Sequence, residues 1–162
     1  MSFLTKLGQQ AQENREKTMK VSDILEEKGN EVMTVRPNDS IYDIARRLEH
    51  EKVGALVVSA NGDSLDGIIS ERDICKGVGL YGPKISSLLA ADLMTREVIT
   101  CGSDDRISDV ARVMTERRIR HVPVRDGARI VGMISIGDIL KHRLDEVILE
   151  TRVLRDIAIS GR

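Results

Sequence analysis

Apolar positions along this chain follow two patterns, one helical and one extended, and each pattern occurs twice. Over residues 41–48, and again over 107–114, apolar side chains recur at the spacing of one helix face. Short apolar runs that are typical of buried strands flank both segments. The pattern predicts strands over 32–35, 53–58, 65–69, 98–101, 121–124 and 129–134, and further helices that start just after Ser70 and Ser135.

The two sets of elements are copies of one unit. Residues 33–58 align with 99–124 at an offset of 66 residues, and residues 67–70 align with 132–135 at an offset of 65. Upstream, Asp23 resembles Asp92 at an offset near 69. A unit of about 60 residues with the order β-α-β-β-α buries little core alone. We therefore expect an α/β (α+β) fold in which two tandem repeats pack through their sheets with pseudo-two-fold symmetry.

The repeats also predict how the chain is divided. We expect an N-terminal tail, a first repeat, a linker, a second repeat and a C-terminal helical extension, over 1–18, 19–80, 81–90, 91–142 and 143–162. Residues 77–82 match Gly-x-Gly-x-x-Gly, but they follow a helix and precede Pro83, so we predict a helix stop there rather than a dinucleotide-binding loop. The extension is more apolar than a solvated helix needs, which predicts that a partner chain covers it.

Composition excludes several classes of protein. Lys and Arg total 25 against 26 Asp and Glu, and this balance argues against a nucleic-acid binder that relies on a positive field. The aromatic residues Phe3, Tyr42 and Tyr81 are too few for a base-stacking platform. No apolar run approaches the ~20 residues of a membrane span, and Cys75 and Cys101 show neither metal-type nor disulfide spacing. We expect a cytoplasmic protein with no metal, nucleic-acid or membrane partner.

Each copy carries a Ser-x-x-Asp motif where a strand meets a helix. Residues 67–73 read Gly-Ile-Ile-Ser-Glu-Arg-Asp, and residues 132–138 read Gly-Met-Ile-Ser-Ile-Gly-Asp. A carboxylate at this place can accept hydrogen bonds from two vicinal ribose hydroxyls, and free helix amides suit a phosphate. The same spacing is also that of a capping box, in which the serine and the acid only close the helix end. Both roles are compatible at one residue, and the sequence leaves them open.

The duplicated motif, inside a duplicated β-α-β-β-α unit, resembles a tandem pair of cystathionine β-synthase (CBS) domains. Such a pair is called a Bateman module, and this chain looks like a stand-alone bacterial-type member. The resemblance covers about residues 20–142 and includes Arg-His-Val-Pro-Val at 120–124. It implies two clefts that bind adenine nucleotides (AMP, ADP or ATP, with NAD or S-adenosylmethionine possible), a homodimer and a regulated partner protein.

The resemblance also implies which residues form each cleft. The cleft of the first motif is expected to contain Ser70, Asp73, Val98, Ile99, Thr100, Arg120 and His121. The cleft of the second motif is expected to contain Val32, Met33, Thr34, Gly54, Ala55, Arg72, Ser135 and Asp138. Pro123 and Gly137 complete the expected nucleotide-binding set.

The two expected clefts differ in charge. Arg120 and His121 are available for a phosphate in the first, whereas Gly54 and Ala55 hold the corresponding positions in the second. This difference predicts unequal affinities or different ligands. Simpler interpretations stay open, because Arg120 and Arg72 are also typical of water-facing charges and His121 of a packed strand residue.

No nucleophile with an adjacent base and no phosphate-transfer loop is visible in the sequence. We therefore expect a non-enzymatic sensor of adenine nucleotides that acts on a partner protein. The alternative is a structural or oligomerisation adaptor whose clefts bind nothing, and the third hypothesis is an enzyme that uses the cleft for nucleotide chemistry.

Overall fold

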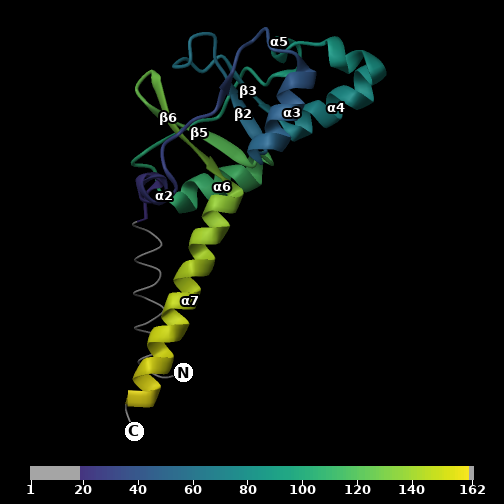
Figure 1. Ribbon diagram of the computed structural model, residues 1–162. Helices are drawn as coiled ribbons and strands as arrows, with labels where there is room; N and C mark the ends of the chain where they lie inside the picture. Colours follow the sequence, from purple (N-terminus) through teal and green to yellow (C-terminus); the bar gives the residue numbers. More distant parts are fainter. Residues whose placement is uncertain (1–18, 161–162) are drawn as a thin grey trace.

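The structure is a computed structural model that describes residues 19–160, and it contains two three-stranded sheets (Figure 1). The first sheet has the order β1 (Thr34–Val35), β2 (Ala55–Val58), β3 (Gly67–Ser70), and the second has the order β4 (Cys101–Gly102), β5 (His121–Asp126), β6 (Arg129–Ser135). In both sheets the first pair of strands is parallel and the second is antiparallel. The predicted mixed α/β fold of two similar repeats is confirmed. The expected tail over 1–18 lies outside the described residues.

Each sheet has two helices that follow its own strands in sequence. These are α3 (Ile41–Glu51) and α4 (Glu71–Tyr81) in the first repeat, and α6 (Ile107–Arg117) and α7 (Ile136–Ser160) in the second. The apolar face of α3 is buried through Ile41, Ile44 and Leu48, as its spacing predicted. All four residues of β2 are buried, because both faces of this strand are covered.

The remaining helices are exchanged between the repeats. α2 (Val21–Lys28) precedes the first repeat but buries Val21, Ile24 and Leu25 in the core of the second. α5 (Ala90–Leu93) precedes the second repeat but packs into the core of the first. Main-chain hydrogen bonds hold the exchanged segments, such as Val21 N to Asp105 O and Ala90 N to Asp39 O, both 2.9 Å.

The glycine of each Gly-apolar-apolar-Ser motif makes room for this exchange. A Cβ atom on Gly132 would lie 2.7 Å from Leu25 Cδ2, on the exchanged helix α2. A Cβ atom on Gly67 would lie 2.7 Å from Met94 Sδ and 2.9 Å from the carbonyl oxygen of Thr95, just after α5. The glycines of the motifs therefore allow the exchanged segments to pack closely against the strands β3 and β6.

Two expectations about element bounds were wrong. Strands predicted over 32–35 and 98–101 are reduced to β1 and β4, of two residues each. The reason is the exchange, because the chain must cross from one repeat to the other just before each strand. The second is the helix stop predicted over 77–82, which comes only at Gly82, the last residue of that stretch, because α4 continues to Tyr81.

Gly77 explains why α4 continues through two glycines. It is buried, and a Cβ atom there would lie 2.8 Å from Leu93 Cδ1 and 2.9 Å from Ile85 Cδ1. Close packing against α5 and the 3₁₀ helix η1 (Gly82–Ser87) therefore outweighs the low helix propensity of glycine. The helix ends only at Gly82, whose φ of 54° suits glycine.

Candidate functional site

The first Ser-x-x-Asp motif closes the start of α4. The main-chain N of Ser70 donates a hydrogen bond of 2.9 Å to Asp73 Oδ2, and the Ser70 hydroxyl donates one of 2.6 Å to the same oxygen. Asp73 therefore has the capping role that the spacing predicted. Among residues 19–160 no donor is bound to Asp73 Oδ1, and the side chain is only half-buried, so this second oxygen can meet a ligand.

A cavity of about 420 Å³ opens beside Asp73, between the two repeats. The first repeat contributes the strand ends at β2 and β3 and the first turns of α4, and the second contributes 95–99 and 117–121. Nine of the expected site residues lie on it: Gly54, Ala55, Ser70, Arg72, Asp73, Val98, Ile99, Arg120 and His121. The structure therefore brings the residues expected around Asp73 into one hollow, with a small apolar wall at Val98 and Ile99.

Sequence reasoning missed other residues of this cavity, namely Ile68, Glu71, Lys76, Thr95, Glu97, Arg117, Arg118 and Ile119. A helical signal could have found Lys76, since it lies three residues after Asp73 and four after Arg72 on α4. Arg117 and Arg118 are part of the same basic run as Arg120. Five basic and three acidic side chains line the cavity in total, so its charge favours an anion.

The structure differs from the expected division between the clefts. Gly54, Ala55 and Arg72 were assigned to the cleft of Asp138, but they line the cavity of Asp73. The cause is the close approach of β2 and β5, where a Cβ atom on Gly54 would lie 2.8 Å from His121 Cε1. Arg72 reaches across the same junction, and its Nη1 donates a 2.5 Å hydrogen bond to Arg118 O.

Several other expected residues lie elsewhere. Thr100 borders a separate hollow of about 220 Å³ beside Cys101. Pro123 is fully buried within β5. Thr34 borders another hollow, near Arg47, whose Nη1 donates a 2.7 Å hydrogen bond to Thr34 O. Val32, Met33, Ser135, Gly137 and Asp138 do not line the Asp73 cavity.

The second motif closes the start of α7 in the same way as the first. The N and Oγ of Ser135 each donate a 2.8 Å hydrogen bond to Asp138 Oδ2. Lys28 adds an ion pair, with its Nζ 2.7 Å from the same oxygen. Burial opposes ionisation of Asp138, but the hydrogen bonds from Lys28 and Ser135 outweigh it, and the pKa of this carboxyl is lowered overall.

His121 lies where the two motifs approach each other. Burial lowers the pKa of this imidazole, and Lys28 and Arg120 act in the same direction, while Glu71 and Asp138 oppose them. The net pKa is below the ordinary value of 6.5, so His121 is mainly neutral at neutral pH. The imidazole therefore offers hydrogen bonds to a ligand, and the positive charge of the cavity comes from its arginines and lysine.

Other chemistry has little support in the described part of the chain. Within 19–160 no three His, Cys, Asp or Glu side chains are grouped so that they could hold a metal ion. Burial, with a smaller effect of Asp105, raises the pKa of the Cys101 thiol to about 12, which makes it a poor nucleophile. None of the helices between residues 19 and 160 has the length and apolar character to cross a membrane.

The family model for the CBS domain matches residues 21–79 and 90–145. The mitochondrial CBS domain-containing protein CBSX3 of Arabidopsis thaliana is 33% identical over 134 residues, which are 78% of this chain and 65% of that protein. The chain thus spans slightly less than two thirds of this relative.

Solved structures agree with the family match. The CBS-domain containing protein ATU1752 from Agrobacterium tumefaciens is 39% identical, with a TM-score of 0.75 over 77% of this chain and 99% of that one. The CBS domain pair of protein MJ0100, solved in complex with 5-methylthioadenosine and S-adenosyl-L-methionine, is 31% identical, with a TM-score of 0.67 over 76% of this chain and 98% of that one. The duplicated fold, the paired Ser-x-x-Asp motifs and these matches together show that the chain belongs to the CBS-domain family, as a tandem pair of CBS domains.

Proposed function

We propose that this CBS domain pair is a regulatory module that binds an adenine nucleotide in the Asp73 cavity. The observation that carries the proposal is the cavity itself. It combines a half-buried carboxylate at a helix start, a small apolar wall and an excess of basic side chains, contributed by both repeats. The carboxylate suits the hydroxyls of a ribose, the apolar wall suits an adenine ring, and the basic side chains suit a phosphate.

Each part of the ligand has a residue to meet it. The two ribose hydroxyls bind Asp73, with Oδ1 as the available acceptor, and each charge-assisted bond is worth roughly 1.5–3 kcal/mol when water is excluded. The adenine ring packs against Val98 and Ile99. The phosphate is directed to Arg120 and its basic neighbours on the 117–120 segment.

The ligand class follows from this chemistry and from a relative. Several cations around one hollow favour AMP, ADP or ATP over an uncharged nucleoside, and NAD is compatible with the same groups. S-adenosylmethionine stays a candidate because the similar MJ0100 pair was solved with two adenosine-containing ligands. The position of the cavity between the repeats supports a sensor, since a ligand there can shift their relative arrangement and so act on a partner protein. We propose no catalytic role and no metal.

An adaptor that works by self-association is the second candidate, and α7 favours it. Seven apolar side chains on this helix are 41–67% exposed: Leu140, Leu144, Val147, Ile148, Leu149, Val153 and Leu154. Complete burial of one such side chain removes roughly 60–120 Å² from water. Leu149 and Val153 lie on the opposite side of the helix from the other five, so one partner would bury five of these side chains, or roughly 300–600 Å² of the roughly 800 Å² per partner that stable interfaces bury. A homodimer is therefore part of the proposal, and it is compatible with nucleotide binding.

A thermal-shift panel tests the sensor. It contains AMP, ADP, ATP, NAD, S-adenosylmethionine and adenosine, with GMP as the control ligand. An adenine ligand at 100 times its Kd is expected to add about 2.7 kcal/mol to the free energy of unfolding.

Asp73→Asn is expected to remove the thermal shift. Asp92→Asn is the matched control, because Asp92 caps α5 through a 2.9 Å hydrogen bond from Leu89 N and lies outside the cavity. If none of the adenine compounds raises the melting temperature of the ligand-free protein, the adaptor becomes the better-supported hypothesis.

A further inference from the structure

The two Ser-x-x-Asp motifs differ in two contacts among the described residues, a 3.1 Å hydrogen bond from Asp138 N to Ser135 Oγ and an ion pair of Asp138. Asp73 Oδ2 accepts hydrogen bonds from Ser70 alone, whereas Asp138 Oδ2 accepts the equivalent bonds from Ser135 and also pairs with Lys28 at 2.7 Å. The Lys28 and Asp138 side chains are only 33% and 23% exposed. The oxygen of Asp138 thus has a cation bound to it that Asp73 lacks among the described residues.

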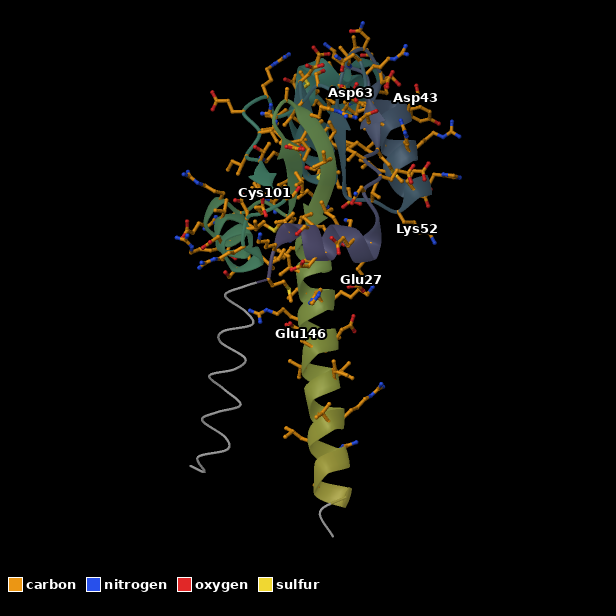
Figure 2. The ribbon with its side chains drawn as sticks, turned by 90° about the vertical axis from the view of Figure 1, so that its left-hand side faces the viewer. Glu27, Asp43, Lys52, Asp63, Cys101 and Glu146 are labelled. Atoms are coloured by element: carbon orange, nitrogen blue, oxygen red, sulfur yellow. The ribbon has the colours of Figure 1, made fainter. Side chains whose placement is uncertain are left out.

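Lys28 is held at this place by packing. It is the last residue of the exchanged helix α2, whose Val21, Ile24 and Leu25 are buried in the core of the second repeat. A second ion pair, 3.6 Å between Glu27 Oε1 and Lys141 Nζ, joins the same end of α2 to α7. Figure 2 shows Glu27 at the end of α2, next to the first turns of α7. The lysine is therefore directed at Asp138 by the fold of α2.

The first repeat has the opposite charge at the corresponding place. The offset of 69 residues that aligns Asp23 with Asp92 also aligns Lys28 with Glu97, on the wall of the Asp73 cavity. A glutamate does not pair with a carboxylate, so Asp73 stays available. The exchange of α2 and α5 therefore places a cation beside one motif and an anion beside the other.

The second motif has fewer cations to attract a phosphate than the first. At the offset of 66, Arg120 corresponds to Gly54 and Arg117 to Glu51, and at the offset of 65 Arg72 corresponds to Gly137. Basic side chains remain at two of the five positions, since Arg118 corresponds to Lys52 and Lys76 to Lys141. We therefore expect the second motif to favour a nucleoside with uncharged hydroxyls more than the first motif does.

We propose that Lys28 closes the second cleft by occupying Asp138, so that the chain binds one adenine ligand, and that loss of the lysine charge opens a second site for a nucleoside. Asp138 Oδ1 has no hydrogen-bond partner among the described residues, so Lys28 acts by neutralising the carboxylate from its position 2.7 Å from Oδ2, beside the place where the ribose hydroxyls would bind. This inference rests on the proposed function, because it assumes that the Asp73 cavity takes an adenine ligand.

Equilibrium dialysis of the full chain with adenosine tests the inference. The wild type is expected to bind one equivalent, and Lys28→Met, which keeps the side-chain length without the charge, is expected to bind two. Lys20→Met is the matched control, because Lys20 precedes the same helix but pairs with the exposed Asp104 at 2.6 Å. It is expected to bind one equivalent. The double variant Lys28→Met with Asp138→Asn is expected to return to one.

The outcomes separate this inference from the proposed function. One equivalent in both the wild type and Lys28→Met would overturn the role of Lys28 and leave the Asp73 site standing. Two equivalents in the wild type would also overturn it. Absence of adenosine binding in every protein, with AMP also unbound, would contradict the proposed function and this inference together.

Discussion

Asp73 uses one carboxylate oxygen to cap α4, has no hydrogen-bond donor at the other among the described residues, and lines the cavity between the repeats. Capping alone needs only the first oxygen, whereas ribose binding needs the geometry of the whole group. The two roles therefore respond differently to a small change in side-chain length, and this difference can be measured.

Asp73→Glu separates capping from ligand binding. Glutamate is favoured at the third position of a capping box, so the free energy of unfolding is expected to hold or rise slightly. The extra methylene moves the carboxylate out of register with the ribose, and AMP affinity is expected to fall about tenfold to a hundredfold, or roughly 1.5–3 kcal/mol. Calorimetric titration and urea unfolding measure the two quantities. Unchanged affinity, equal to that of an Asp92→Glu control, would leave Asp73 with the capping role only.

Arg120 is expected to recognise the phosphate rather than the nucleoside. Arg120→Ala removes a cation from the cavity wall, so its effect on AMP is expected to exceed its effect on adenosine by about tenfold or more. Arg129→Ala, an exposed arginine outside the cavity, is the control. Equal losses for AMP and adenosine would show that Arg120 acts through packing.

The ion pair of Asp138 predicts a pH dependence of stability. Its pKa is lowered in the folded protein, so the charged carboxylate stabilises the fold above the unfolded pKa of about 4 and loses this effect as the pH falls through the lower folded value. Urea unfolding should show wild type more stable than Asp138→Asn near pH 6, and the difference should shrink towards about pH 3. Lys28→Met is expected to weaken this pH dependence, and the same dependence without Lys28 would contradict the contribution of the ion pair.

At the scale of elements, the exchange of α2 and α5 joins the two repeats. Each exchanged helix completes the hydrophobic core of the other copy, so neither repeat has its full core from contiguous sequence. The motif glycines lie under these helices, which gives them a packing role that can be tested apart from ligand binding.

Gly67→Ala is expected to destabilise the protein by about 1–3 kcal/mol, the usual cost of overpacking. The added methyl group would meet the Thr95 carbonyl, a main-chain atom that hydrogen-bonds to Ile68 N and has little room to move. Gly79→Ala on α4 is the control, because nothing lies within 4 Å of a Cβ atom there and alanine favours the helix by up to about 1 kcal/mol. Thermal or urea unfolding compares the two, and equal effects would argue against the close approach of α5.

At the scale of the whole molecule, α7 projects from the body and carries exposed apolar residues along its length (Figures 1 and 2). Leu140, Leu144, Val147 and Leu154, with Thr151 between the last two, follow the alternating spacing of four and three residues that lets two helices pack side by side. A second copy of the chain would bury this stripe from both partners.

Light scattering at micromolar concentration is expected to give twice the monomer mass, with and without AMP. Leu144→Glu is expected to shift the protein to the monomer, because Leu144 is 60% exposed in the middle of the stripe. Leu80→Glu is the control, since Leu80 is a similarly exposed leucine on α4. A monomeric wild type, or dissociation by Leu80→Glu alone, would contradict an interface formed by α7.

The sequence by itself determined the features that depend on near neighbours. The duplicated β-α-β-β-α order, the buried face of α3 and the helix starts after Ser70 and Ser135 follow from periodicity and capping, which act over three or four residues. The grouping of Asp73 with Arg120 and His121 did not follow from periodicity or capping. It came from the family resemblance. The boundaries between tail, repeats and linker stay predictions.

Only the tertiary structure decided which repeat each segment packs against. Contacts such as Lys28 with Asp138 or Gly54 with His121 join residues far apart in sequence, and their free energy comes from burial that no local pattern contains. For the same reason α4 continues through Gly77. The free energy gained by packing against Leu93 exceeds the helix-propensity cost of a glycine, which is about 1 kcal/mol. The close approach of β2 and β5 decided that Gly54, Ala55 and Arg72 belong to the cavity of Asp73. The exchange of α2 decided that Asp138 has a lysine beside it.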